Sequence, residues 1–316
     1  MLITNKLTIT TFVYGNRYVD LFEKCCLRSL FQEGNIPFLL KHGYEITHLV
    51  YTTTPDAGRL AEITNRAKLK YLEGTNVDQD KLSYQIITNP AVGYGRVIAK
   101  TNMIFLLQSV TYGVHNPAPF FLASPDYFIG DYSLSNLLAY QTKKDTCLAA
   151  LHVRVDAPSF LNFLEGTQGN IQNPSLVRIA FGMLSQSWKD SFIDKDNNCS
   201  FHAGTAVQKI ATNLYTVTFR IPTTFLARLN QSDLEYFSGH CDYGHWDHSW
   251  PEHLISQKRF KFIGSSDMFF AVELTAGDMN QSKCRAGDLW NDEYFSTKIH
   301  SETNRNFLAV VRGDGE

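Results

Sequence analysis

The chain has 316 residues with a formal net charge of -2, and its 44% hydrophobic and 19% charged residues are typical of a soluble globular protein with one large or two smaller α/β domains. The near-neutral charge argues against a nucleic-acid partner, because proteins that bind the phosphate backbone usually carry a basic face. The sequence has no apolar run of about 18 residues and no signal-peptide pattern at Met1–Lys6, so we expect a cytoplasmic protein without a transmembrane segment.

The first ninety residues or so alternate between strand and helix patterns. Residues 7–14 are rich in β-branched and aromatic side chains and predict a strand that stops at a Gly15–Asn16 turn. From Arg17 to Gly34, apolar side chains recur at helical spacing. The same patterns then predict a strand over 46–51, a helix through Leu60 to Leu69, and a short strand over 84–88.

The next predicted helix covers residues 97–111. The segment that follows it is the most informative part of the chain. There an apolar strand over 120–122 runs directly into Asp126 and, five residues later, Asp131. Strands separated by helices predict a largely parallel, doubly wound sheet. Such sheets bind ligands at the carboxyl ends of their strands, and carboxylates there suit Mg²⁺ or Mn²⁺ on a diphosphate. An ordinary turn is the alternative interpretation, since Asp and Gly are common turn residues.

The second half has a mixed pattern. It predicts strands over 147–155, 214–220 and 260–263, helices over 158–164 and 175–188, and a strand or buried helix over 268–274. We expect the polar tail from Asn291 to be frayed. Asp267 follows the strand over 260–263, where it either presents a second carboxylate or caps a helix.

Residues 237–253 contain four of the ten histidines, three acidic residues and two of the four tryptophans. Such a cluster can bind a metal, act as an acid or base near neutral pH, and stack on a sugar ring. A polar surface loop is the alternative. The spacing of His245 and His248 matches neither H-E-x-x-H nor a zinc finger.

Arg96 and Lys100 lie four residues apart at the start of the helix before the acidic strand, and both can face a diphosphate. A solvated basic face explains them equally well. The sequence contains no G-x-G-x-x-G, P-loop or G-x-S-x-G motif, which argues against a Rossmann dehydrogenase, a P-loop enzyme and an α/β-hydrolase.

The order of these features resembles the nucleotide-sugar half of GT-A-fold glycosyltransferases. The resemblance is carried by a strand that ends at Tyr14-Gly15, a second strand before Thr52, a basic helix from Arg96, and a fourth strand that ends at Ser124-Pro125-Asp126. It covers roughly residues 7–155. It implies a GT-A-like α/β fold with a mixed, mostly parallel central sheet flanked by helices. Residues 1–155 would then form the nucleotide-sugar-binding half, and residues 156–316 the acceptor-binding half of the same domain.

The resemblance also implies roles for individual residues. Asp126 would hold Mn²⁺ or Mg²⁺ on the donor diphosphate as the last residue of a D-x-D motif, although Ser124 stands where the first Asp would be. His245 or His248 would be a later metal ligand or phosphate contact. The implied nucleotide-sugar-binding residues are Val13, Tyr14 and Arg17, which would hold the nucleotide base, Arg96 and Lys100, which would approach ribose or phosphate, and Ser124. Our candidates for the catalytic base or an acceptor contact are Asp247 and Asp267.

The function expected from the resemblance is transfer of a sugar from a nucleotide-diphosphate donor to a glycan, lipid-linked or protein acceptor. A cation at Asp126, with Arg96 or Lys100, would neutralise the charge of the leaving diphosphate. Two other functions fit the same residues. One is a metal-dependent hydrolase that uses Asp126 and the histidines of residues 240–253, and the other is a non-catalytic glycan-binding module in which Asp126 and Asp131 are structural.

Overall fold

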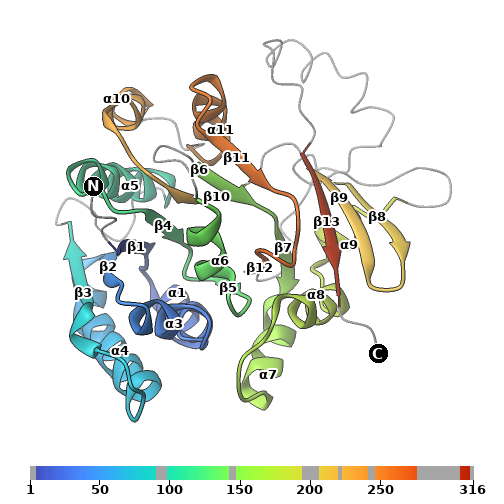
Figure 1. Cartoon of the computed structure of the whole chain (residues 1–316), viewed down its shortest axis with the longest axis horizontal. Helices are drawn as coiled ribbons and strands as arrows, with labels where there is room; N and C mark the ends of the chain where they lie inside the picture. The colour runs from blue at the N-terminus through green and yellow to red at the C-terminus, as the bar shows by residue number, and fades with distance from the viewer. Residues whose placement is uncertain are drawn as a thin grey trace.

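The protein is a mixed α/β structure built on a large central sheet (Figure 1). The computed structural model describes residues 5–89, 98–141, 147–193, 206–219, 223–240, 246–275 and 307–313. Within these ranges a seven-stranded sheet has the order β11-β6-β10-β4-β1-β2-β3, and only β10 runs antiparallel to its neighbours. The predicted mixed, mostly parallel sheet flanked by helices is therefore confirmed.

The first half alternates strands and helices as predicted. Its elements are β1 (Lys6–Phe12), α1 (Asn16–Leu21), the π-helical segment η1 (Phe22–Leu27), α2 (Arg28–Leu30), α3 (Ile36–Lys41), β2 (Glu45–Thr52), α4 (Thr54–Leu72), the short 3₁₀ helix η2 (Gln79–Lys81), β3 (Leu82–Thr88), α5 (Ile98–His115) and β4 (Phe120–Ala123). The strands form where β-branched and aromatic residues cluster, and α3 and α4 each begin with a proline in the first turn.

The strand order reverses between β1 and β4, and the helices change faces at the same point. The chain moves outward through β1, β2 and β3 and then returns through α5 to β4 on the other side of β1. Leu49 and Tyr51 of β2 pack against Phe105 of α5, whereas Val50 lies in the core that contains Leu60 of α4. Figure 1 accordingly shows α5 on one side of the sheet and α1, α3 and α4 on the other. The carboxyl ends of β1 and β4 thus form the topological switch point, where α/β sheets bind ligands.

The second half completes the central sheet and adds two smaller ones. Its elements are β5 (Tyr127–Ile129), α6 (Ser133–Tyr140), β6 (Cys147–Ala150), β7 (His152–Asp156), α7 (Ala157–Gly166), α8 (Asn173–Gly182), α9 (Gln186–Lys189), β8 (Ala206–Ala211), β9 (Leu214–Phe219), β10 (Thr223–Ala227), α10 (Gln231–His240), α11 (Trp246–Ser256), β11 (Phe260–Ile263), β12 (Ala271–Thr275) and β13 (Phe307–Arg312). The described strands of the smaller sheets have the orders β5-β12-β7 and β13-β9-β8.

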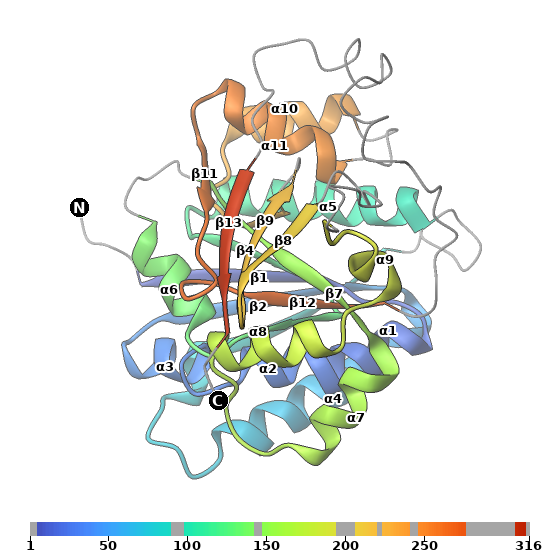
Figure 2. The same ribbon diagram turned by 90° about the vertical axis from the view of Figure 1, so that its right-hand side faces the viewer.

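Two expectations for the second half were wrong. The single strand predicted over 147–155 is two strands, because the chain leaves the central sheet after β6 and enters the β5-β12-β7 sheet as β7. The tail from Asn291 is not frayed throughout, since β13 pairs antiparallel with β9 (Figure 2). Ala309 and Val311 of β13 are buried in the core that contains Val177 of α8, and this burial offsets the loss of chain entropy. The sequence predicted either a strand or a helix over 268–274, and this segment forms the strand β12 from Ala271 onward.

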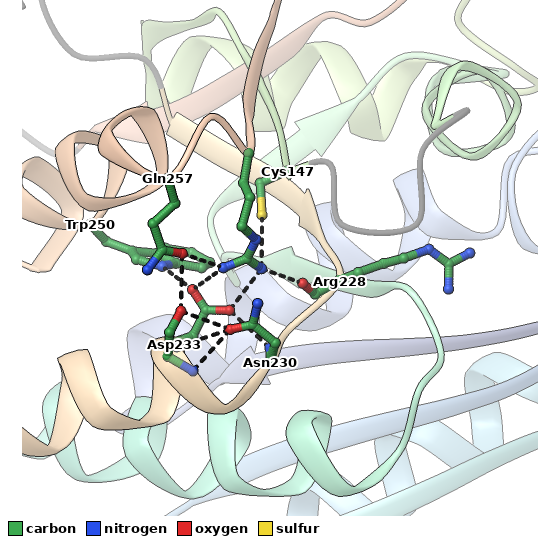
Figure 3. A network of polar contacts seen from close by, with 8 residues as sticks. Cys147, Arg228, Asn230, Asp233, Trp250 and Gln257 are labelled. Carbon is green, nitrogen blue, oxygen red and sulfur yellow. Dashed lines mark hydrogen bonds and ion pairs between the residues drawn. The ribbon is translucent and has the colours of Figure 1, made fainter.

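A buried ion pair connects the helices α10 and α11 to the far edge of the central sheet (Figure 3). Asp233 of α10 accepts hydrogen bonds from both terminal nitrogens of Arg259, at 3.0 and 2.9 Å, and from Nε1 of Trp250 at 3.2 Å. Arg259 also donates to the carbonyl oxygen of Arg228 at 2.6 Å, just after β10. Because both charges are partnered, we assign this network a structural role.

Among the described helices, none is long and apolar enough to cross a membrane.

Candidate functional site

The carboxyl ends of β1 and β4 bring two predicted site segments together. The two strands are parallel neighbours in which Thr11 pairs with Ala123, so Tyr14 and Asp126 both follow at the same edge of the sheet. Between β1 and α1 the chain turns at Gly15, whose φ of 80° favours glycine. The Gly15 amide donates to Oδ2 of Asp56 at 2.8 Å, which anchors this turn to the start of α4.

The residues predicted to hold the nucleotide base differ in what they can offer a ligand. Val13 is fully buried, and its amide donates to the carbonyl oxygen of Tyr51 at 2.8 Å, so its side chain belongs to the core. Tyr14 is half-buried and donates its hydroxyl to Oδ1 of Asn102 at 2.8 Å, and burial raises the pKa of its phenol to about 12. Arg17 is exposed, with its guanidinium carbon 5.4 Å from the centroid of the Tyr18 ring.

Asp126 has the electrostatic features expected of a functional carboxylate. It is half-buried in the turn between β4 and β5, and Ser124 donates a hydrogen bond to its Oδ1. Burial, followed by the negative charge of Glu273, raises its pKa to about 6, although the Ser124 hydrogen bond acts in the opposite direction. A carboxyl group whose pKa is raised by desolvation and by a second carboxylate is a candidate for a binding or catalytic role.

A polar sheet face beside Asp126 was missed by the sequence analysis. The strands β5, β12 and β7 alternate, with Phe128, Val272, Leu274, Val153 and Val155 buried in the core. On the opposite face lie Tyr127, His152, Arg154 and Glu273, which we call the polar sheet face. Glu273 pairs directly with Tyr127 on one side and with Arg154 on the other.

Glu273 is the centre of this polar sheet face. Its Oε2 lies 2.9 Å from Nε2 of His152 and 3.2 Å from Nε of Arg154. Burial alone would raise its pKa, but the hydrogen bond and charge of His152, together with Arg154, hold it at about 2. The ring centroids of His152 and Tyr127 are 5.3 Å apart in a stacked arrangement. Glu273 is therefore ionised at neutral pH and contributes its negative charge to the surroundings of Asp126.

A sequence signal for part of this face exists. In His152-Val153-Arg154-Val155 polar and apolar residues alternate, and this period of two is typical of a strand with one buried and one polar face. Val272-Glu273-Leu274-Thr275 alternates in the same way, but the sequence does not show that this segment pairs with residues 152–156, which are distant in the chain.

The other predicted site residues have different outcomes. Arg96 and His245 lie outside the described residues, and so do the side chains of Lys100, Asp247 and His248, whose backbones belong to α5 and α11. Their predicted roles stay predictions.

Asp267 and Asp131 are described in full. Asp267 is exposed in the turn after β11, and the strand β12 follows it, so it does not cap a helix. Asp131 is buried, and its carboxylate accepts hydrogen bonds from the Gly34 amide at 2.6 Å and from Gln172 Nε2 at 2.9 Å. These bonds favour the structural interpretation of Asp131. Among the described residues, no group of three or more His, Cys, Asp or Glu side chains could hold a metal ion.

No protein-family model matches this chain, and no curated protein matches its sequence. A structure assigned as a glucose-1-phosphate thymidylyltransferase from Bacillus anthracis, in complex with a sucrose, has a TM-score of 0.35 at 9% identity and covers 93% of this chain and 97% of its own. Core-mannan synthase A from Aspergillus fumigatus, in a Mn/GDP form, has a TM-score of 0.37 at 11% identity and covers 91% of this chain and 82% of its own. Likenesses this weak carry no argument about function.

Proposed function

We propose that this protein is a glycosyltransferase that moves a sugar from a nucleotide-diphosphate sugar to a hydroxyl of a glycan, lipid-linked or protein acceptor. The observation that carries the proposal is the position of Asp126. A half-buried carboxylate with a raised pKa directly follows a central strand at the topological switch point, where open α/β sheets bind nucleotides and related ligands.

The surroundings of Asp126 fit a divalent cation held jointly with a diphosphate. Mg²⁺ is commonly bound through one or two carboxylates, with substrate phosphates and water completing its coordination. One carboxylate from the protein therefore suffices, and Ser124 supports it through a hydrogen bond to Oδ1. The nearby charge of Glu273 makes an ionised Asp126 unfavourable by itself, and a cation would offset that repulsion. When bound, Mn²⁺ or Mg²⁺ would neutralise the charge that develops on the leaving diphosphate.

Other residues of the chain would bind and orient the donor. Tyr14 lies at the end of β1 and is held by its hydrogen bond to Asn102, so it offers a preorganised ring beside the switch point. Arg17 is exposed on the first turn of α1 and would contact the nucleotide base, whereas Arg96 and Lys100 would approach ribose or phosphate. In this scheme residues 1–155 hold the donor and residues 156–316 the acceptor, with Asp247 and Asp267 as candidate acceptor contacts.

The test is a calorimetric titration of UDP and of GDP into the full chain, with and without Mn²⁺. We expect micromolar binding that requires Mn²⁺ and that is weakened at least tenfold, about 1.4 kcal/mol, in Asp126→Ala. Asp80→Ala removes an exposed carboxylate in η2 and is the matched control, with unchanged affinity. Failure of both nucleotides to bind would refute the proposal. Equal binding to Asp126→Ala, or without metal, would refute the role of Asp126.

A further inference from the structure

Four residues of three strands form one continuous chain of hydrogen bonds beside Asp126. Thr223 Oγ1, at the start of β10, lies 3.1 Å from Nδ1 of His152, and Nε2 of His152 lies 2.9 Å from Oε2 of Glu273. Arg154 donates to the same oxygen of Glu273 at 3.2 Å. The hydrogen bonds therefore run from the Thr223 hydroxyl through the His152 imidazole to the ionised Glu273 carboxylate, which the Arg154 guanidinium group holds in place.

The direction of the proton donors follows from the chemistry of the groups. An ionised carboxylate only accepts hydrogen bonds, so the His152 nitrogen that faces Glu273 must carry the proton. In the neutral imidazole the other nitrogen, Nδ1, is then an acceptor, and the Thr223 hydroxyl donates to it. Thr223 also lies near Tyr127, where it acts to lower the pKa of that phenol, although burial raises this pKa overall. This is the arrangement of a base that is oriented by a carboxylate and that activates a hydroxyl.

This chain of hydrogen bonds lies at the proposed donor site and is partly open to solvent. Tyr127 directly follows Asp126 in the sequence, and the charge of Glu273 acts on Asp126. The side chains of His152, Glu273 and Arg154 keep 20%, 18% and 23% of their surfaces exposed, and Thr223 is also only partly buried. A half-buried ionic network is weak evidence for stability, because apolar residues of similar volume are often at least as stabilising. Its place beside Asp126 suggests chemistry instead.

We infer that Thr223, His152 and Glu273 form a proton relay that accepts the proton of the acceptor hydroxyl during sugar transfer. The inference rests on the proposed function. The acceptor oxygen forms a bond to the anomeric carbon while the bond from that carbon to the diphosphate oxygen breaks, and its electron pair stays on the diphosphate. The acceptor proton passes to Thr223 Oγ1 as the proton of Thr223 moves to Nδ1 of His152. Glu273 stabilises the resulting imidazolium, and direct displacement inverts the anomeric configuration.

The test compares Thr223→Val, which removes the hydroxyl with little change of shape, with Thr223→Ser, which keeps it. Thr224→Val is the matched control, since Thr224 is buried and its hydroxyl has no hydrogen-bond partner among the described residues. Calorimetry with UDP-glucose, UDP-galactose, UDP-N-acetylglucosamine and GDP-mannose identifies the donors that bind. The measured rate is release of the nucleoside diphosphate from these donors, with water as the acceptor.

We expect Thr223→Val to lower kcat by about 100-fold, the smaller end of what a placed acid or base contributes, with the KM for donor and the affinity for UDP unchanged. Thr223→Ser should keep most of the rate, and Thr224→Val all of it. His152→Asn is a second variant with the same expected loss, so the test does not depend on the folding of one protein.

Three results would overturn the relay. Thr223→Val or His152→Asn with a rate near that of the wild type would refute it while leaving the proposed function intact. A wild type that binds a donor but never hydrolyses it would also refute it, because a base at the anomeric carbon activates water as well. A wild type that binds no nucleotide would refute the proposed function, and the relay with it.

Discussion

Replacing Asp126 by Asn should stabilise the folded protein at neutral and alkaline pH in the absence of metal. The pKa of Asp126 is raised from 3.8 to about 6 in the folded state, by burial and by the charge of Glu273. Below the unfolded pKa, both states carry the proton and the group makes no difference to stability. Between pH 3.8 and about pH 6 the unfolded state ionises while the folded state keeps its proton, so the wild type loses stability as the pH rises and Asp126→Asn does not.

The size of the effect follows from the difference between the two pKa values. One pH unit corresponds to about 1.4 kcal/mol, so the shift sets an upper limit of about 3 kcal/mol for the gain in the free energy of unfolding. Asp126 is only half-buried, and we therefore expect about 1 to 3 kcal/mol. Asn keeps an oxygen that can accept the hydrogen bond from Ser124, so this contact is preserved.

The assay is urea unfolding of both proteins with EDTA, at about pH 8, where the full difference should appear, and at about pH 4.5, where most of it should vanish. Asp80→Asn changes an exposed carboxylate and should show no difference at either pH. Adding Mn²⁺ with UDP should stabilise the wild type and not Asp126→Asn. A variant that is no more stable than the wild type at the higher pH would refute our account of the electrostatics at Asp126.

Three further substitutions test other parts of the structure. Asp233→Ala should lower the free energy of unfolding by about 3 to 5 kcal/mol, measured by chemical denaturation, because it leaves the buried Arg259 guanidinium without its counter-ion. Gly130→Ala should lower it by about 1 to 3 kcal/mol, since the new methyl group would overlap the side chain of Asn173. Glu273→Gln should lower the pKa of Asp126, measured by NMR titration, because the charge of Glu273 is one of the causes that raise it.

Each of these has a control and a result that would contradict it. Asp190→Ala changes an exposed carboxylate and should alter stability by less than about 0.5 kcal/mol, so an equally mild Asp233→Ala would contradict the structural role of the ion pair. Gly182→Ala adds a methyl group with no atom within 4 Å, so a loss as large as that of Gly130→Ala would argue against the overlap. An unchanged pKa of Asp126 in Glu273→Gln would contradict the coupling of the two carboxylates.

Local patterns in the sequence predicted the first half of the fold well. The strands β1, β2, β3 and β4 and the helices α4 and α5 lie where periodicity predicted them, because each has enough apolar residues at one period to mark its buried face. Asp126 could also be located, because a polar residue that follows a buried strand is visible in the sequence. The boundary between β6 and β7 could not be found, since apolar β6 runs into the alternating pattern of β7 and the chain changes sheets at Leu151 without any turn residue.

The sequence by itself determined the alternation of strands and helices, the mostly parallel sheet, and the position of a carboxylate at the end of β4. Only the tertiary structure decided which side chains surround that carboxylate. Glu273, His152 and Thr223 come from β12, β7 and β10, and they meet because strands that are distant in the chain pair with one another. The strand β13 likewise exists through its pairing with β9. Periodicity shows which face of an element is buried, but not which partner buries it, because strand pairing depends on the packing of the whole core.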